Sequence, residues 1–140
     1  MSGRVYVSGM GVVSALGHGR EAYWSALCAG RCAAAPVEGF DTGDLGRSIA
    51  CEIKDFDPGQ ELLSDQERGR QGRCSELALV AARMAMRDAE LVVGQVQPAR
   101  MSVVLGTTMG EVDVISRVEQ AWLHEGEEAF GRRDLLRYGT

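Results

Sequence analysis

The start of the chain constrains its fold most strongly, because a short apolar segment runs directly into a turn rich in glycine. Val5 to Gly17 reads V-Y-V-S-G-M-G-V-V-S-A-L-G. Val5 to Ser8 has the β-branched and aromatic side chains that are enriched in strands. The glycines that follow permit a tight turn or a close approach to another segment of backbone. The sequence therefore predicts a strand over 5–8 that leads into a glycine turn.

Patterns typical of helices follow this strand. A short amphipathic helix is predicted over 21–29, and Gly30 is placed to end it. A longer, alanine-rich helix is predicted from Ser75, and its apolar stripe between flanking alanines favours burial on more than one side. Two further helices are predicted over 112–124 and 132–138.

A second apolar run separates these helices. Met101 to Leu105 predicts a second, buried strand. Residues 48–53 indicate a brief further strand inside an irregular excursion over 33–57. The order of strand, helix, excursion, long helix, strand and helix is typical of an α/β layer with parallel strands. Because a sheet normally needs three or more strands, the predicted architecture is unfinished.

Composition excludes several classes of protein. The chain has 140 residues, with 15 Lys and Arg against 20 Asp and Glu, and its net charge of −5 would repel a nucleic acid. No segment approaches the roughly 20 apolar residues that a membrane helix requires. Ser8 and Gly9 interrupt the first apolar run before a signal-peptide core forms. We therefore expect a cytoplasmic chain of one domain, residues 1–140, with no nucleic-acid or membrane partner.

Two motifs that suggest a cofactor or a metal are incomplete. Gly9, Gly11 and Ser14 match the dinucleotide-binding fingerprint poorly, because Ser14 replaces the third glycine and no acidic residue closes a second strand at the required distance. A phosphate-binding loop of the Walker type is absent from the sequence. Cys28 and Cys32 are four residues apart, and no second close pair completes a zinc site. The residues therefore predict neither a cofactor nor a metal.

The remaining candidate residues favour structural roles. The four cysteines, predicted to be free and mostly buried, are Cys28, Cys32, Cys51 and Cys74. Cys74 comes closest to a nucleophile, since it lies beside an arginine at the start of the long helix, but no partner base is identified. His18 and His124 are isolated, as surface or capping histidines often are. Trp24 and Trp122 lie on apolar helical stripes and are predicted to pack there.

Several motifs together resemble one family. They are the opening segment, the first helix ending in L-C-A-G-R, the F-D pair at Phe40, I-K-D-F-D from Ile53, and V-L-G-T-T-M-G-E from Val104 to Glu111. Their collinear order over essentially the whole chain resembles the N-terminal part of the β-ketoacyl-acyl carrier protein synthases. These are the condensing enzymes of fatty-acid and polyketide synthesis. The resemblance therefore implies an acyltransferase as the parent enzyme.

The same resemblance implies a fold and a chemistry. The family has a thiolase-like α/β fold of two similar halves, and this chain would supply an incomplete N-terminal half, with a parallel or mixed sheet and packed helices. Family members move an acyl chain from a carrier thioester to a cysteine and join it to malonyl carrier protein with loss of carbon dioxide. This reaction needs an activated thiolate and N–H donors for the thioester oxyanion. The implied partners are acyl carrier protein, acyl and malonyl thioesters, and either a second copy in a homodimer or a complementing C-terminal chain.

The family's catalytic motifs do not occur in these residues. Its nucleophile lies in an A-C-[AST]-[AS]-G segment followed by two histidine motifs, whereas here no cysteine follows Cys74. We therefore assign no catalytic residue. One segment does carry over, because the family segment that matches Gly106 to Gly110 lines the acyl cavity. The resemblance implies that Thr108 and Met109 form part of the pocket wall, with Met109 at the pocket's end; the alternative is that Met109 only packs under its loop.

Three hypotheses stay open. The leading one is the N-terminal piece of a ketosynthase, inactive by itself, whether a truncated or split product, an incompletely read gene or one part of a two-chain enzyme. The second is a non-catalytic acyl-binding or interaction module with the same partial fold. The third is a small nucleotide-binding α/β protein, which titration with NAD or ATP tests directly.

Overall fold

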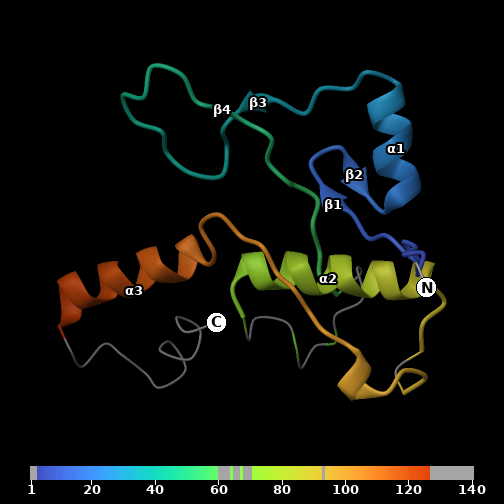
Figure 1. The fold of residues 1–140 in the computed structure, drawn as a ribbon. Coiled ribbons are helices and arrows are strands. Elements are labelled where there is room, and N and C mark those ends of the chain that lie inside the picture. The colour runs from blue at the N-terminus through green and yellow to red at the C-terminus, as the bar shows by residue number, and fades with distance from the viewer. Residues whose placement is uncertain (1–2, 60–63, 65–66, 68–70, 93, 127–140) are drawn as a thin grey trace. The chain divides into compact units, whose positions relative to one another are not determined.

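Three α-helices carry most of the regular structure in the computed structural model, which describes residues 3–59, 64, 67, 71–92 and 94–126 (Figure 1). They are α1 (Arg20–Cys28), α2 (Arg73–Asp88) and α3 (Val112–Glu125), and a short 3-10 helix, η1 (Pro98–Arg100), lies between α2 and α3. Each α-helix lies where the sequence predicts one. The helix predicted over 132–138 lies outside the described residues.

The ends of α1 and α2 follow from local hydrogen bonds. After α1, the Gly30 N donates to the Leu27 carbonyl and the Arg31 N donates to the Ala26 carbonyl, both at 3.0 Å. This is the Schellman arrangement, which requires a left-handed residue, and Gly30 supplies it with φ of +66°. The predicted stop at Gly30 is therefore confirmed. Glu90, with φ of +52°, takes the same place after α2.

The strands of the described residues are short and antiparallel. β1 (Val13–Ser14) pairs with β2 (Gly17–His18), with Val13 opposite His18. β3 (Ala35–Pro36) pairs with β4 (Ile49–Ala50), with Ala35 opposite Ala50. The strand predicted over 48–53 is thus reduced to two residues. The expected parallel pairing does not occur among the described strands.

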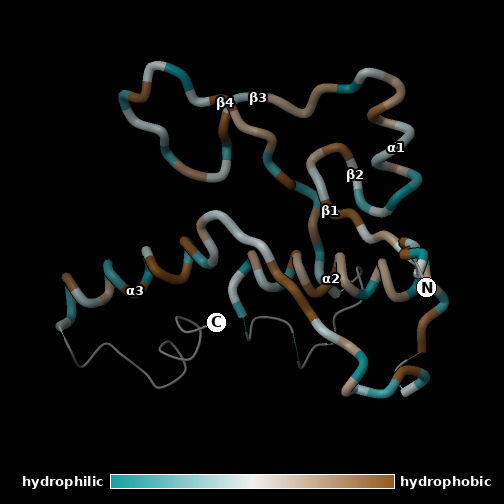
Figure 2. The backbone as a smooth tube through the Cα atoms, viewed as in Figure 1, coloured by the Kyte–Doolittle hydropathy of each residue, from teal (hydrophilic) through white to brown (hydrophobic). Residues whose placement is uncertain are grey.

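The predictions of two strands, over 5–8 and 101–105, are wrong for this structure. Residues 5–8 and 101–105 form no strand, and their side chains are exposed, with Val103 at 92% and Val5 at 96%. The apolar stretch before α3 is visible in Figure 2. A strand is stabilised by hydrogen bonds to a neighbouring strand, and neither segment has one among the described residues.

The chain divides into two compact units, Met1–Asp57 with Val80–Val92, and Pro58–Leu79 with Val93–Thr140. Among the described residues few apolar side chains are buried: Ala26 and Val80 in the first unit and Val114 in the second. The prediction that α2 is buried on more than one side is wrong, because Leu79 and Ala82 are exposed. None of the described helices is long and apolar enough to cross a membrane.

The two tryptophans also correct an expectation. Trp24 on α1 and Trp122 on α3 are predicted to pack on apolar stripes, but 63% and 56% of their surfaces are exposed. More than half of each tryptophan surface therefore faces outward in this structure. Helical periodicity locates the apolar face of a helix but does not say what lies against it.

Candidate functional site

The glycine segment at the start of the chain lies directly against α2 within the first unit (Figure 1). A Cβ atom at Gly9 would stand 2.6 Å from the backbone N of Ala89, and one at Gly11 would stand 2.8 Å from the backbone N of Ala85. Ordinary van der Waals contact begins at 3.4 Å, so only glycine permits this approach. The glycines are therefore packing positions.

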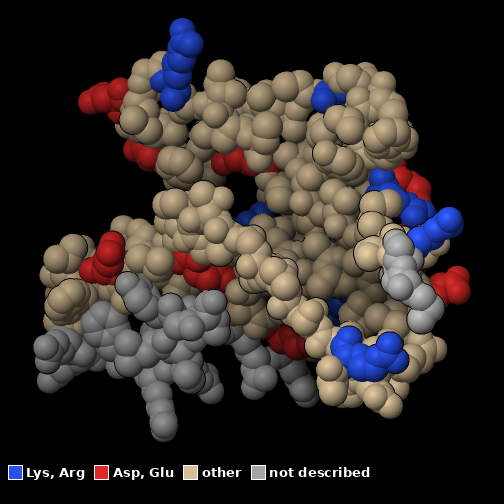
Figure 3. Space-filling view, viewed as in Figure 1, with Lys and Arg blue, Asp and Glu red and all other residues tan. Residues whose placement is uncertain are grey.

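Asp88, the last residue of α2, holds the same segment. Its Oδ2 accepts a hydrogen bond from the Met10 N at 2.9 Å, and its Oδ1 lies 2.8 Å from Nη1 of Arg20. Arg20 begins α1 and also pairs with Glu21 at 2.8 Å. The hydrogen bond to Glu21, followed by the charge of Asp88, raises the pKa of Arg20. The Asp88 carboxylate thus links the N-terminal segment, α1 and α2. On the face drawn in Figure 3, acidic and basic side chains lie next to each other in places.

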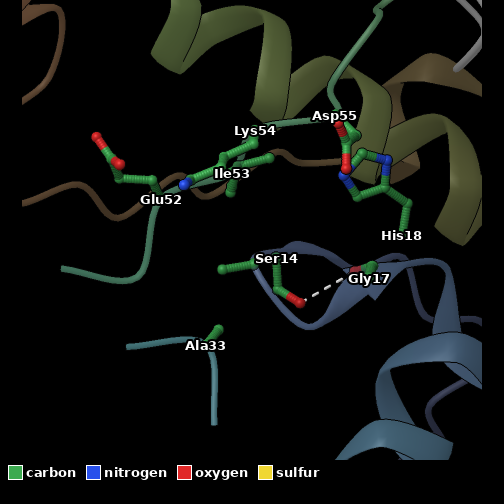
Figure 4. Close-up of a pocket in the computed structure, with 9 residues that line it drawn as sticks. Ser14, Gly17, His18, Ala33, Glu52, Ile53, Lys54 and Asp55 are labelled. Atoms are coloured by element: carbon green, nitrogen blue, oxygen red, sulfur yellow. Dashed lines mark hydrogen bonds between the residues drawn. The ribbon is translucent and has the colours of Figure 1, made fainter. Parts of the chain in front are cut away.

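A cavity of about 440 Å³ lies beside the β1–β2 hairpin (Figure 4). Its lining residues are Ser14, Ala15, Gly17, His18, Ala33, Glu52, Ile53, Lys54 and Asp55. The Ser14 Oγ donates to the Gly17 carbonyl at 3.0 Å, which commits its proton to the hairpin. The His18 ring meets the ring of Phe56 edge-on, with 5.8 Å between centroids. Figure 4 shows the side chains of His18 and Asp55 near each other at one end.

The charged side chains at the other end of this cavity are compensated locally. Glu52 accepts hydrogen bonds from the backbone N of Glu38 and of Gly39, both at 2.9 Å, and these bonds lower the pKa of Glu52. The Lys54 Nζ lies 2.7 Å from the Glu38 carboxylate, and this hydrogen bond raises the pKa of Lys54. These contacts hold together the excursion around β3 and β4.

The turn predicted to form part of an acyl pocket lies in the second unit, between η1 and α3. The Gly110 N donates to the Thr107 Oγ1 at 3.0 Å, which closes a turn over 107–110. Thr108 and Met109 lie within it, and 70% of the Met109 surface is exposed. The cavity beside β1 and β2 is lined by other residues. The prediction for Thr108 and Met109 therefore stays a prediction.

Glu111, which follows this turn, is a site residue that sequence reasoning missed. Its carboxylate accepts hydrogen bonds from the backbone N of Ser75 at 2.7 Å and of Cys74 at 3.1 Å, in the first turn of α2. The N–H groups of a first helical turn have no partner inside the helix, and a carboxylate stabilises them. The structure thus ties the turn over 107–110 to the start of α2.

The cysteines and histidines form no cluster of three or more metal-ligating residues within the described part of the chain. All four cysteines are free, but Cys28, Cys32 and Cys51 are exposed, so the prediction of mostly buried thiols is wrong for these three. Cys74 is half-buried, and its Sγ lies 4.0 Å from the Thr107 Oγ1. The backbone N of Cys74 donates to the Glu111 carboxylate, so this residue is held at the start of α2 through its main chain.

The mixed helices and strands place the chain in the α/β class, and comparisons with known proteins define it further. The family described as "Beta-ketoacyl synthase, N-terminal domain" matches residues 2–133. The chain belongs to this family. Its resemblance to the condensing enzymes of fatty-acid and polyketide synthesis is therefore confirmed.

Individual relatives agree with this assignment. The chain is 32% identical over 123 residues to a 3-oxoacyl-[acyl-carrier-protein] synthase 2 of a Synechocystis species, covering 88% of this chain and 29% of the relative. It is 39% identical over 123 residues to the ketoacyl synthase alpha subunit of the tetracenomycin polyketide synthase of Streptomyces glaucescens, covering 88% of this chain and 28% of that subunit. The chain thus spans less than a third of the length of these relatives.

A solved structure supports the fold. The ishigamide ketosynthase/chain length factor superposes with a TM-score of 0.80 at 37% sequence identity, over 94% of this chain and 32% of that one. Likeness to a ketosynthase places the chain in the thiolase-like α/β class. The short strands described here therefore belong to a segment of that fold.

Proposed function

We propose that the chain supplies the N-terminal segment of a β-ketoacyl-acyl carrier protein synthase. In this function an enzyme thiolate takes an acyl group from a carrier thioester and releases the carrier thiol. Malonyl carrier protein then loses carbon dioxide, and the resulting carbanion attacks the acyl thioester, forming a carbon–carbon bond and freeing the enzyme thiolate. The observation that carries the proposal is the family match over residues 2–133 in a sequence without the family's nucleophile and histidine motifs.

The proposed partners follow from this reaction. They are acyl carrier protein with its acyl and malonyl thioesters, and polypeptide that bears the nucleophile, either a complementing C-terminal chain or the remainder of a homodimeric enzyme. The exposed apolar segments around Val5 and Val103 support the need for further polypeptide, because exposed apolar surface marks sites of association. We therefore propose that the 140-residue chain is inactive by itself and poorly soluble.

Two measurements test this proposal. Acyl transfer from acyl carrier protein and decarboxylation of malonyl carrier protein are followed with the chain alone and with the chain combined with polypeptide that bears the family's nucleophile and histidine motifs. We expect turnover only in the second case. Circular dichroism and sedimentation of the isolated chain provide the counter-test. A monomer with a cooperative, stable melt contradicts the proposal and favours a stand-alone acyl-binding module.

Within this function we propose that Thr108 and Met109 form part of the wall of the acyl pocket. Met109 is flexible and apolar, and it lies on an exposed turn where it can meet an alkyl chain. Met109→Trp adds bulk to the wall, so binding of long acyl chains should fall at least tenfold while binding of short chains changes little. Leu123→Trp, at an exposed apolar position of α3, is the matched control. Equal losses for all chain lengths contradict a role at the end of the pocket.

A further inference from the structure

Glu111 is the buried charged side chain among the described residues, with 8% of its surface exposed. A buried carboxylate is costly unless hydrogen bonds compensate it. Here Oε1 accepts from the Ser75 N at 2.7 Å and Oε2 accepts from the Cys74 N at 3.1 Å. Both oxygens are thus used by the first turn of α2, a helix that begins much earlier in the sequence.

Gly72 provides the space for this contact. A Cβ atom at position 72 would fall on the Glu111 carboxylate and would lie 2.8 Å from Cγ2 of Val114. The Gly72 carbonyl also accepts the Glu76 N at 3.1 Å, which starts the hydrogen bonding of α2. The start of α2 and the Glu111 side chain therefore fit together closely, and Val114, which is buried, completes the contact.

The backbone of Glu111 connects this contact to the turn before it and the helix after it. Its carbonyl accepts the N–H groups of Val114 at 3.1 Å and Ile115 at 3.0 Å, which begins α3. The preceding turn is closed by the Gly110 N–Thr107 Oγ1 bond. Most of the Met109 side chain is exposed, so its own packing contributes little to holding the turn.

We propose that Glu111 is a positioning residue: by capping α2 it fixes the turn over 107–110, and with it Thr108 and Met109. The further consequence, that this position sets which acyl lengths the wall accepts, rests on the proposed function. Glu111→Gln tests the cap with little change in shape, because the amide keeps one acceptor oxygen and turns the other position into a donor. Glu111→Ala removes both acceptors.

The first readout follows the turn directly. The methyl resonance of ¹³C-labelled Met109 and the hydrogen exchange of the Cys74 and Ser75 amides are measured in the full chain, together with its complementing polypeptide where solubility requires it. Both Glu111 variants should shift the Met109 resonance and speed exchange of the two amides about five- to tenfold, as expected for loss of a helix cap. Glu119→Gln, an exposed carboxylate on α3, is the matched control and should change neither.

A third substitution separates the cap from the turn. Thr107→Val removes the Oγ1 acceptor, so it should shift the Met109 resonance while the Cys74 and Ser75 amides exchange as in the unmodified chain. A Met109 resonance that stays unchanged in Glu111→Gln and Glu111→Ala overturns the positioning role. This result is independent of whether any acyl group binds.

The second readout is the acyl preference, measured with hexanoyl, decanoyl and hexadecanoyl pantetheine as probes. Glu111→Gln should change the ratio of affinities between the longest and shortest probe by about threefold or more, in a protein that stays folded. Met109→Trp should also change the ratio of affinities between the longest and shortest probe. If it does so while Glu111→Gln keeps the ratio of the unmodified protein, the proposal that Glu111 influences the accepted acyl length is wrong. If the unmodified assembly binds none of the probes, the proposed function fails, and the Met109 resonance alone decides the positioning role.

Discussion

Gly11→Ala is the substitution that tests the packing of the opening segment most directly. The added methyl would fall on the carbonyl O of Ala81, and it would lie 2.8 Å from the carbonyl C of Ala81 and 2.8 Å from the backbone N of Ala85. Because ordinary contact begins at 3.4 Å, the overlap is about 0.6 Å with each of the last two atoms and larger with the carbonyl O. All three atoms belong to the backbone of α2, which cannot yield without breaking helical hydrogen bonds. The N-terminal segment must therefore move away from the helix.

The cost of this movement has two parts. Overpacking a close contact typically costs about 1–3 kcal/mol. The movement also lengthens the bond from the Met10 N to Asp88 from 2.9 Å toward the limit of hydrogen-bond geometry, about 3.5 Å. Loss of that bond, which is exposed, adds about 1 kcal/mol. We therefore expect Gly11→Ala to lower the free energy of unfolding by about 2–4 kcal/mol.

Urea unfolding, followed by circular dichroism, measures this loss. Gly46→Ala is the matched control, because nothing lies within 4 Å of a Cβ atom at Gly46. That control should be neutral or more stable by about 0.4–1 kcal/mol, since alanine restricts the unfolded chain. Adding Ala81→Gly to Gly11→Ala should not restore stability, because the overlap at Ala81 is with backbone atoms. A Gly11→Ala chain as stable as the Gly46→Ala chain refutes the reasoning.

Two further predictions concern burial and charge. Val80→Ala should lower the free energy of unfolding by about 1–3 kcal/mol, because Val80 is fully buried. Val103→Ala should change the free energy of unfolding of the isolated chain by less than about 0.5 kcal/mol, because Val103 is almost fully exposed. Equal effects of the two substitutions in urea unfolding contradict the burial described here. Glu52→Gln should be destabilising at neutral pH, because backbone hydrogen bonds lower the pKa of Glu52 in the folded chain below its ordinary 4.5. The stabilising contribution of the Glu52 carboxylate is therefore fully present above pH 4.5 and is lost as the pH falls through the lowered pKa of the folded chain. A stability difference between the two chains that stays constant from neutral to acid pH contradicts this.

The helices could be predicted from sequence because their hydrogen bonds are local. The apolar spacing before Gly30 is enough to place α1 and its end, since the partners that close the helix lie within five residues. The strands predicted at 5–8 and 101–105 have equally clear composition. Their hydrogen bonds, however, must come from another segment, and no described segment supplies them. A segment with the composition of a strand thus forms a strand only where another segment pairs with it, and the composition does not identify that segment.

The candidate site likewise has one part that the local sequence indicates and one part that depends on a distant segment. The family motif around Thr108 and Met109 directs attention to the turn, but nothing near it in sequence indicates the helix to which it is tied. Glu111 reads as an acidic residue at the start of its own helix, α3, where a carboxylate is favourable. Its side chain instead caps α2 through Cys74 and Ser75. Sequence-local rules assign such a carboxylate to the nearer helix, and only the tertiary structure shows which N–H groups it accepts.

The packing of the opening segment does have a sequence signal, but this signal is divided between two separate stretches of the chain. Gly9 approaches Ala85 and Ala89, and Gly11 approaches Ala81 and Ala85, so the extended segment runs antiparallel to α2. Two residues of extended chain span about 6.7 Å, and four residues of helix rise about 6.0 Å. The G-x-G spacing and the A-x-x-x-A-x-x-x-A spacing therefore stay in register over both contacts. Considered alone, the glycines predict a turn and the alanines predict a helix; considered together, their matching repeats predict that a strand-like segment lies against that helix.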